Sequence, residues 1–259
     1  MQRWMKSGCL FAMLGTASFA LAASPFVGTW KLNQAKSHLT GEIMTFSPAS
    51  NGMIRETVPE GSYTFKTDGN PYPSLFGNTE SWQQVSGTSW KVAIHGTGGY
   101  TYSQTLDLSE DGYSLVITTQ GQQPNGSAFH DENVYTRQTG GQGLMGKWKS
   151  TKVKTDTDEM LEFAAYGNDG LTWSLPQMKA TLHAKFDGKD YAPVGPTVPK
   201  GLTLALTRSG PNSFMVVEKL HGHPMYKGTY TVASDGRTMT NVGGPVGQSQ
   251  PETVVYDKQ

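Results

Sequence analysis

The chain has 259 residues, of which 36% are hydrophobic and 16% are charged, and its 21 basic residues balance 21 acidic ones. No block of like charge occurs along it, which argues against nucleic acid and against anionic membrane surfaces as partners.

The first 22 residues are predicted to be a bacterial signal peptide. Arg3 and Lys6 precede an uncharged run from Gly8 to Phe19, and residues 20–22 place small side chains at the cleavage positions. A lipoprotein is the alternative, but its modified cysteine would follow the apolar run, whereas Cys9 opens it. Cleavage would remove this only cysteine and leave 19 basic against 21 acidic residues. We therefore expect a secreted or periplasmic protein without disulfides or membrane insertion after cleavage.

The rest of the chain contains one pattern twice. Phe26-Val27-Gly28-Thr29-Trp30-Lys31 returns as Leu144-Met145-Gly146-Lys147-Trp148-Lys149, and Val134-Tyr135-Thr136-Arg137 returns as Val255-Tyr256-Asp257-Lys258. Landmarks between them keep their order and spacing: Phe46 and Phe163, Asp68 and Asp187, Asp111 and Asp235. Such a duplication constrains the fold more than the function.

Within each copy the pattern predicts short strands and tight turns. Asn-Gly and Asp-Gly pairs, which favour hairpin turns, begin at Asn51, Asp68, Asp111, Asn125, Asp169, Asp187 and Asp235. Trp90, Val92 and Ile94 alternate with polar or small residues, as in a half-buried strand. Residues 155–166 have near capping-box spacing for a helix, but their counterpart in the first copy is β-like, so we expect a strand. The prediction is eight or nine strands per copy.

The predicted fold is all-β, with two tandem antiparallel up-and-down β-barrels related by internal duplication. The expected order is a signal peptide (1–22), a first barrel (23–138), a flexible linker (139–143) and a second barrel (144–259). The alternative is a single larger sheet system formed by both copies.

Gly28-Thr29-Trp30 and Gly146-Lys147-Trp148 resemble the Gly-x-Trp opening of lipocalins. The resemblance implies that each Trp closes one end of a barrel and that a basic residue of the last strand packs over it. We expect Arg137 over Trp30 and Lys258 over Trp148. The opening, the Asp-Gly-x-x-Tyr of residues 68–72 and the Val-Tyr-x-Arg-Gln ending of the first copy are also similar to uncharacterised secreted proteins of soil bacteria.

Candidate catalytic residues are His130, Asp131 and Glu132, which place an imidazole beside two carboxylates. A polar loop is the alternative reading. The second copy has Gln250-Pro251-Glu252 there, without the imidazole. Nucleophile motifs are missing, since no Gly-x-Ser-x-Gly occurs and no cysteine would remain in the exported chain.

We predict no metal site and no cofactor. His221-Gly222-His223 aligns with the predicted turn at Gly98, so its two imidazoles flank a turn, and no third ligand is evident. The run from Gly141 to Lys147 matches the start of a phosphate-binding loop, but Trp148 stands where Ser or Thr is required.

Candidate ligand-binding residues are His95, Tyr72 and Tyr191. His95 lies on the polar side of its strand and faces either solvent or a lumen. Tyr72 and Tyr191 occupy matching positions, and Tyr191 opens a segment that contains Pro193, Pro196 and Pro199 and exists only in the second copy. A stiff loop of this kind suits a preformed barrel mouth or an interdomain contact, so we expect any ligand site to differ between the copies.

The lipocalin resemblance implies an exported protein that binds a small apolar or amphipathic molecule. Two alternatives stay open. One is an extracytoplasmic enzyme, a lyase, isomerase or glycan hydrolase with a His and carboxylate acid–base pair. The other is a non-catalytic envelope protein that offers only an interaction surface. The sequence does not indicate an oligomeric state.

Overall fold

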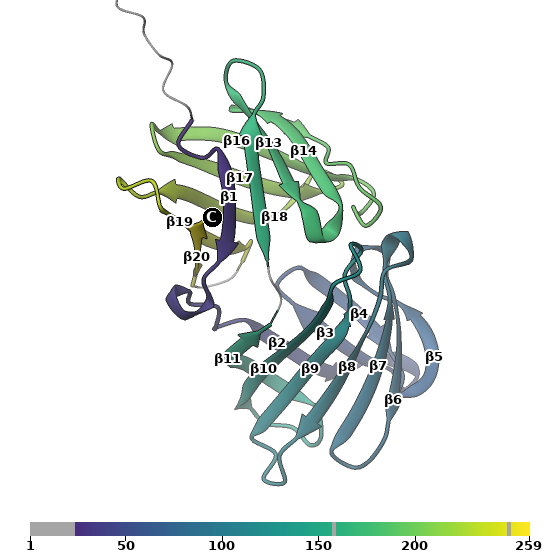
Figure 1. Cartoon of the computed structure of the whole chain (residues 1–259). Helices are drawn as coiled ribbons and strands as arrows, with labels where there is room; N and C mark the ends of the chain where they lie inside the picture. The colour runs from purple at the N-terminus through teal and green to yellow at the C-terminus, as the bar shows by residue number, and fades with distance from the viewer. Residues whose placement is uncertain (1–23, 157–158, 248–249) are drawn as a thin grey trace, which may run out of the picture.

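The computed structural model describes residues 24–156, 159–247 and 250–259 (Figure 1). The predicted signal peptide, residues 1–22, lies outside this part of the chain. Within the described ranges the ordered elements are strands and five single turns of 3-10 helix. None of these residues forms a helix that is long and apolar enough to cross a membrane.

The strands form two ten-stranded antiparallel sheets, each coiled into a nearly closed barrel (Figure 1). Barrel 1 contains β2 (Ile43–Pro48), β3 (Ile54–Val58), β4 (Gly61–Phe65), β5 (Asp68–Pro73), β6 (Thr79–Gln84), β7 (Ser89–His95), β8 (Thr101–Leu108), β9 (Ser114–Gln122), β10 (Ala128–Thr139) and β11 (Gly146–Thr155). Barrel 2 contains β1 (Gly28–Leu32), β12 (Met160–Ala165), β13 (Gly170–Leu175), β14 (Ala180–Lys185), β15 (Asp187–Tyr191), β16 (Leu202–Gly210), β17 (Ser213–Leu220), β18 (His223–Val232), β19 (Thr238–Pro245) and β20 (Glu252–Lys258). The predicted fold of two all-β barrels is confirmed, and the alternative helix is the strand β12.

The two copies exchange their first strands. β1 pairs with β12 and β20 of barrel 2, whereas β11 pairs with β2 and β10 of barrel 1. The predicted boundaries, 23–138 and 144–259, are therefore wrong for these strands. Barrel 1 is the continuous stretch from β2 to β11, and the chain crosses between barrels after β1 and again after β11 (Figure 1). The predicted linker, residues 139–143, comprises the last residue of β10 and the first four residues of the turn to β11, so it connects two strands of barrel 1.

The two Gly-x-Trp strands, β1 and β11, are interior strands of their sheets and stand in exchanged barrels. Trp30 and Trp148 are both fully buried, and each indole Nε1–H donates to the carbonyl oxygen four residues earlier, at 2.7 and 2.8 Å. The Arg137 guanidinium lies 4.1 Å from the Trp148 ring centroid, and the Lys258 ammonium lies 5.1 Å from that of Trp30. The expected pairs, Arg137 with Trp30 and Lys258 with Trp148, are wrong because the strand exchange moves each Trp to the other barrel.

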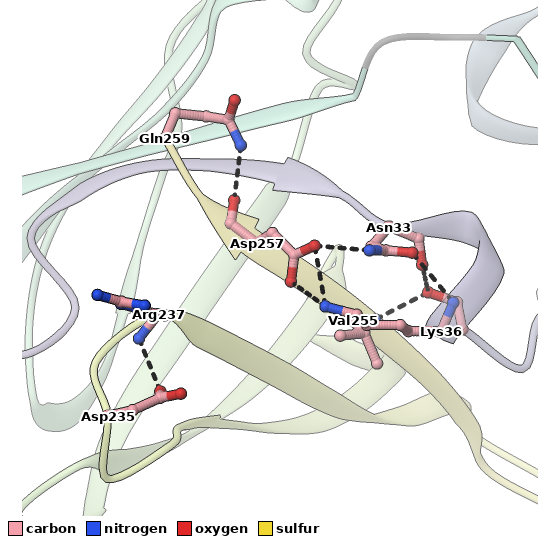
Figure 2. A network of polar contacts seen from close by, with 8 residues as sticks. Asn33, Lys36, Asp235, Arg237, Val255, Asp257 and Gln259 are labelled. Atoms are coloured by element: carbon pink, nitrogen blue, oxygen red, sulfur yellow. Dashed lines mark hydrogen bonds and ion pairs between the residues drawn. The ribbon is translucent and has the colours of Figure 1, made fainter.

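The first crossing segment is attached along β20 (Figure 2). The Asn33 amide donates to the Asp257 carboxylate at 2.6 Å, and Lys36 Nζ forms an ion pair with the same carboxylate at 2.8 Å. The backbone N–H of Asn33 donates to the Val255 carbonyl at 2.7 Å. These contacts hold the chain against barrel 2 for several residues before it enters barrel 1.

Each barrel has its own apolar core. Every second residue along a strand points inward, and these residues form the core. In barrel 1 the largest buried side chains are Phe46, Phe65, Trp82, Ile94, Leu106, Leu115 and Trp148. In barrel 2 they are Phe26, Trp30, Leu161, Leu171 and Phe214. Aromatic rings fill much of both lumens, so any binding space lies at a barrel end and not through a hollow centre.

Candidate functional site

The predicted catalytic triplet does not converge. Neighbouring residues of a strand point to opposite faces, and His130, Asp131 and Glu132 follow one another on β10. The His130 side chain is exposed, and Glu132 forms an ion pair with Lys152 at 3.7 Å. Asp131 instead accepts a hydrogen bond from the Thr155 hydroxyl. The imidazole and the adjacent carboxylate of Asp131 therefore do not share one site.

The predicted ligand-binding residues lie apart and have structural partners. His95 is exposed at the end of β7. The Tyr72 hydroxyl donates to the Asp68 carboxylate at 2.8 Å, and the Tyr191 hydroxyl donates to Asp187 at 3.0 Å. The repeated Asp-Gly-x-x-Tyr motif therefore shapes the start of β5 and of β15, the terminal strands of the two sheets. The Asp-Gly pairs at residues 68 and 187 therefore begin strands and do not form the hairpin turns that the sequence predicts.

His221 and His223 are exposed around the turn between β17 and β18. His221 has φ 50° and Gly222 has φ 81°, both in the left-handed region that a tight hairpin turn requires. Within the described ranges, no group of three or more His, Cys, Asp and Glu side chains is arranged to hold a metal ion.

A pocket of about 190 Å³ opens at the end of barrel 2. One wall comes from the sheet and is apolar: Trp173, Leu182, Leu202 and Leu204. The other comes from residues 191–201, here named the proline segment, through Pro193, Thr197, Val198 and Pro199. This is the segment that the sequence comparison singled out as present in the second copy only.

The proline segment is held in place by backbone hydrogen bonds. Val194 and Thr181 exchange two N–H···O bonds of 2.8 Å, which forms a β-bridge to β14. The Thr197 hydroxyl donates to the Met178 carbonyl at 3.2 Å. The pocket is therefore preformed, and a ligand would not bear the entropic cost of ordering this wall.

Two polar groups of the pocket lining have no partner in the described part of the chain. Glu218 on β17 is half-buried and makes no hydrogen bond or ion pair with the described residues, and desolvation raises the pKa of its carboxyl. Trp173 on β13 is only 7% exposed, and its buried indole N–H donates to no atom. Buried polar groups normally have partners, so the indole N–H, together with the half-buried carboxyl, marks where a ligand's own polar atoms would be accommodated.

The same locus in barrel 1 is occupied by a hydrogen-bonded cluster. Strand register makes Glu56 the counterpart of Trp173, since each pairs with the repeated Phe46 or Phe163. By the same register Tyr63 corresponds to Leu182, Glu80 to Leu204 and Ile94 to Glu218. One barrel thus has three polar groups at this locus and the other has a single carboxyl among apolar walls.

In barrel 1 these polar groups satisfy one another. The Tyr63 hydroxyl lies 2.6 Å from Glu56 Oε2 and 2.5 Å from Glu80 Oε2, and the Trp82 indole donates to Glu80 at 3.0 Å. Desolvation raises the pKa of Glu56 to about 8. Glu56 is therefore mostly protonated at pH 7, and the Tyr63 hydroxyl lies within donating distance of both carboxyls. This cluster needs no ligand to complete it.

Sequence reasoning did not select Glu218. The signal for it was available in the repeat, because the alignment that joins Trp90 to Phe214 also joins Ile94 to Glu218. The second copy thus has a carboxyl where the first copy has a buried aliphatic residue. Local inconsistencies of this kind mark functional sites.

Comparisons of the chain with protein-family models, with curated proteins and with solved structures find no match.

Proposed function

We propose that this protein is an exported, lipocalin-like carrier that binds a small apolar or amphipathic molecule in the pocket of barrel 2. The observation that carries the proposal is the preformed apolar pocket beneath the proline segment, which is lined by the half-buried Glu218 carboxyl and by Trp173, whose buried indole N–H has no partner. The Gly-x-Trp strands, the basic residues over both Trp rings and the N-terminal leader pattern of the sequence support the lipocalin-like, exported part of the proposal.

The size of the pocket limits the ligand. An apolar cavity of about 150 Å³ is enough to bind benzene, so about 190 Å³ accommodates one ring with a short substituent. Drug-sized ligands need roughly 300 Å³ or more. A long acyl chain or a sterol would therefore place only one end in the pocket. The enzyme alternative has less support, because its acid–base triplet is divided between two strand faces.

Nuclear magnetic resonance titration of the full exported chain with benzyl alcohol tests the proposal. We expect saturable shifts of signals from Leu182, Leu204 and Val198. Leu202→Trp fills the pocket and should remove these shifts. Val194→Trp introduces the same side chain in the neighbouring proline segment, but Val194 is 63% exposed and outside the pocket lining, so binding should persist.

Absence of any saturable shift in the unaltered protein would contradict the proposal, as would equal binding by the Leu202→Trp and Val194→Trp variants. Because the unaltered protein alone can give the first of these results, the test does not depend on the folding of Leu202→Trp.

A further inference from the structure

We infer that the ligand of this pocket carries a protonated amine that pairs with Glu218, on a small apolar body that contacts the surrounding walls. The inference rests on the proposed function and adds the chemical class of the ligand.

The first support is the position of Glu218 in the barrel. Glu218 pairs across the sheet with Tyr226, and its counterpart Ile94 pairs with Tyr102 in the same register. Ile94 is only 2% exposed and belongs to the barrel 1 core. The fold therefore uses an aliphatic side chain at this point. Glu218 is half-buried there, and a carboxyl in place of an aliphatic side chain loses apolar packing and part of its own hydration. Such a cost is expected where function and not folding selects the residue.

The second support is the set of groups that face Glu218. Leu204 on β16 and Trp173 on β13 do not titrate, and Tyr226 and Tyr230 on β18 are phenols that are neutral at pH 7, with pKa values that burial raises further. Besides burial, the carboxyls of Glu218, Glu252 and Glu159 also raise the pKa of Tyr226. The nearest lysine in sequence, Lys219, is engaged by Asp190 at 2.7 Å. No cation of the described chain is thus in place to neutralise Glu218.

The third support is the contrast with barrel 1. There, Glu56 and Glu80 share the Tyr63 hydroxyl, and the cluster is satisfied without a cation. In barrel 2 the counterparts of Glu56, Tyr63 and Glu80 are Trp173, Leu182 and Leu204, and none of these three forms a hydrogen bond with Glu218. An ammonium group would supply a charge-assisted hydrogen bond, and the apolar walls would cover the rest of a small ligand.

The test compares three probes of nearly equal shape on the full exported chain at pH 8: benzylamine in its ammonium form, benzyl alcohol and benzoate. Calorimetry should show benzylammonium binding at least ten-fold more tightly than benzyl alcohol, with benzoate weakest. Glu218→Gln keeps the shape and removes the charge, so it should abolish the preference for the amine while benzyl alcohol still binds. Glu56→Gln is the matched control at the equivalent locus of barrel 1 and should leave all three affinities unchanged.

Lowering the pH from 8 to 5 should weaken benzylammonium binding as Glu218 takes up a proton, and should leave benzyl alcohol binding nearly constant. Glu218→Ile is a second variant. It introduces the residue found at the equivalent position of barrel 1, Ile94, so the fold should tolerate it.

The outcomes separate the two proposals. Benzyl alcohol binding as tightly as benzylammonium, or an amine preference that survives both Glu218 substitutions, would overturn the inference and leave the proposed function standing. Binding of none of the probes would overturn both.

Discussion

At the scale of single residues, the two barrels treat buried carboxyls in opposite ways. Barrel 1 stabilises Glu56 by keeping a proton on it within a hydrogen-bonded cluster, whereas barrel 2 leaves Glu218 without a partner. Both arrangements link protonation to folding, because the folded state holds protons that the unfolded chain would release near the ordinary carboxyl pKa.

The Glu56 cluster predicts a pH-dependent stability. The pKa of Glu56 rises from 4.5 to about 8 on folding, with Tyr63, Glu80 and Glu42 as the titratable groups that act on it. Its contribution is fully present below pH 4.5 and is lost as the pH rises toward and through 8. Glu56→Gln should therefore raise the stability at pH 8.5 by about 2 kcal/mol and have little effect at pH 4.5. Urea unfolding at both pH values measures this, and parallel curves for the two proteins would contradict it.

At the scale of secondary-structure elements, the exchanged first strands show what the sequence could and could not predict. Both Gly-x-Trp strands occupy the same kind of position, beside the last strand of a sequence copy (β10 or β20), with the Trp directly opposite its basic residue. The motif therefore predicts that the strand lies beside a strand with a basic residue, but it does not predict which of the two barrels the strand joins. A short turn connects β10 and β11, and strands that follow one another closely usually pair. This pairing gives β11 to barrel 1 and leaves β1 for barrel 2.

The candidate site was predictable to a similar extent. The proline segment was found from the sequence because it has no counterpart in the first copy. Glu218 was missed because an apolar-to-acidic difference between copies leaves the strand pattern unchanged. Tyr72 and Tyr191 were candidates because aromatic residues suit a barrel mouth, yet both hydroxyls are used by neighbouring Asp residues. Alternation could not assign His95 to the outer face, since both faces of a closed barrel alternate alike.

The basic residues over the two Trp rings predict unequal mutational costs. Arg137 lies over Trp148 and also donates to the carbonyls of Gly112 and Gly143, both at 2.6 Å, and to that of Met145. Arg137→Ala should cost about 3 kcal/mol of unfolding free energy. Lys258→Ala, which removes an ammonium over Trp30, should cost about 1 kcal/mol. Chemical denaturation of both variants measures the difference, and a larger loss for Lys258→Ala would show that the account of these contacts is wrong.

At the scale of the whole molecule, barrel 1 is predicted to fold alone. Its ten strands are continuous from β2 to β11, so residues 42–156 contain the complete sheet. Residues 42–138 lack β11 and with it Trp148, and should stay unfolded. Circular dichroism and amide signal dispersion distinguish the two fragments. An unfolded 42–156 fragment, or a folded 42–138 fragment, would contradict the observed strand exchange.

The barrels also touch at the pocket. A β-carbon at Gly98 of barrel 1 would lie 2.0 Å from the Pro196 carbonyl oxygen in the proline segment, whereas one at Gly99 would meet nothing within 4 Å. Both glycines have left-handed φ, 74° and 78°, so substitution strains the backbone equally. Gly98→Ala should displace the proline segment and weaken benzyl alcohol binding about ten-fold, with Gly99→Ala as the matched control. Equal affinities in the two variants would exclude this coupling.

The binding site in barrel 2 is tested most directly by locating a bound probe. Intermolecular nuclear Overhauser effects between benzylammonium and the isotope-labelled full exported chain report which side chains the ligand contacts. We predict effects from the ring protons to the methyl groups of Leu182, Leu204 and Val198, and their loss in the Leu202→Trp variant. Effects confined to barrel 1 or to the outer face of barrel 2 would contradict it.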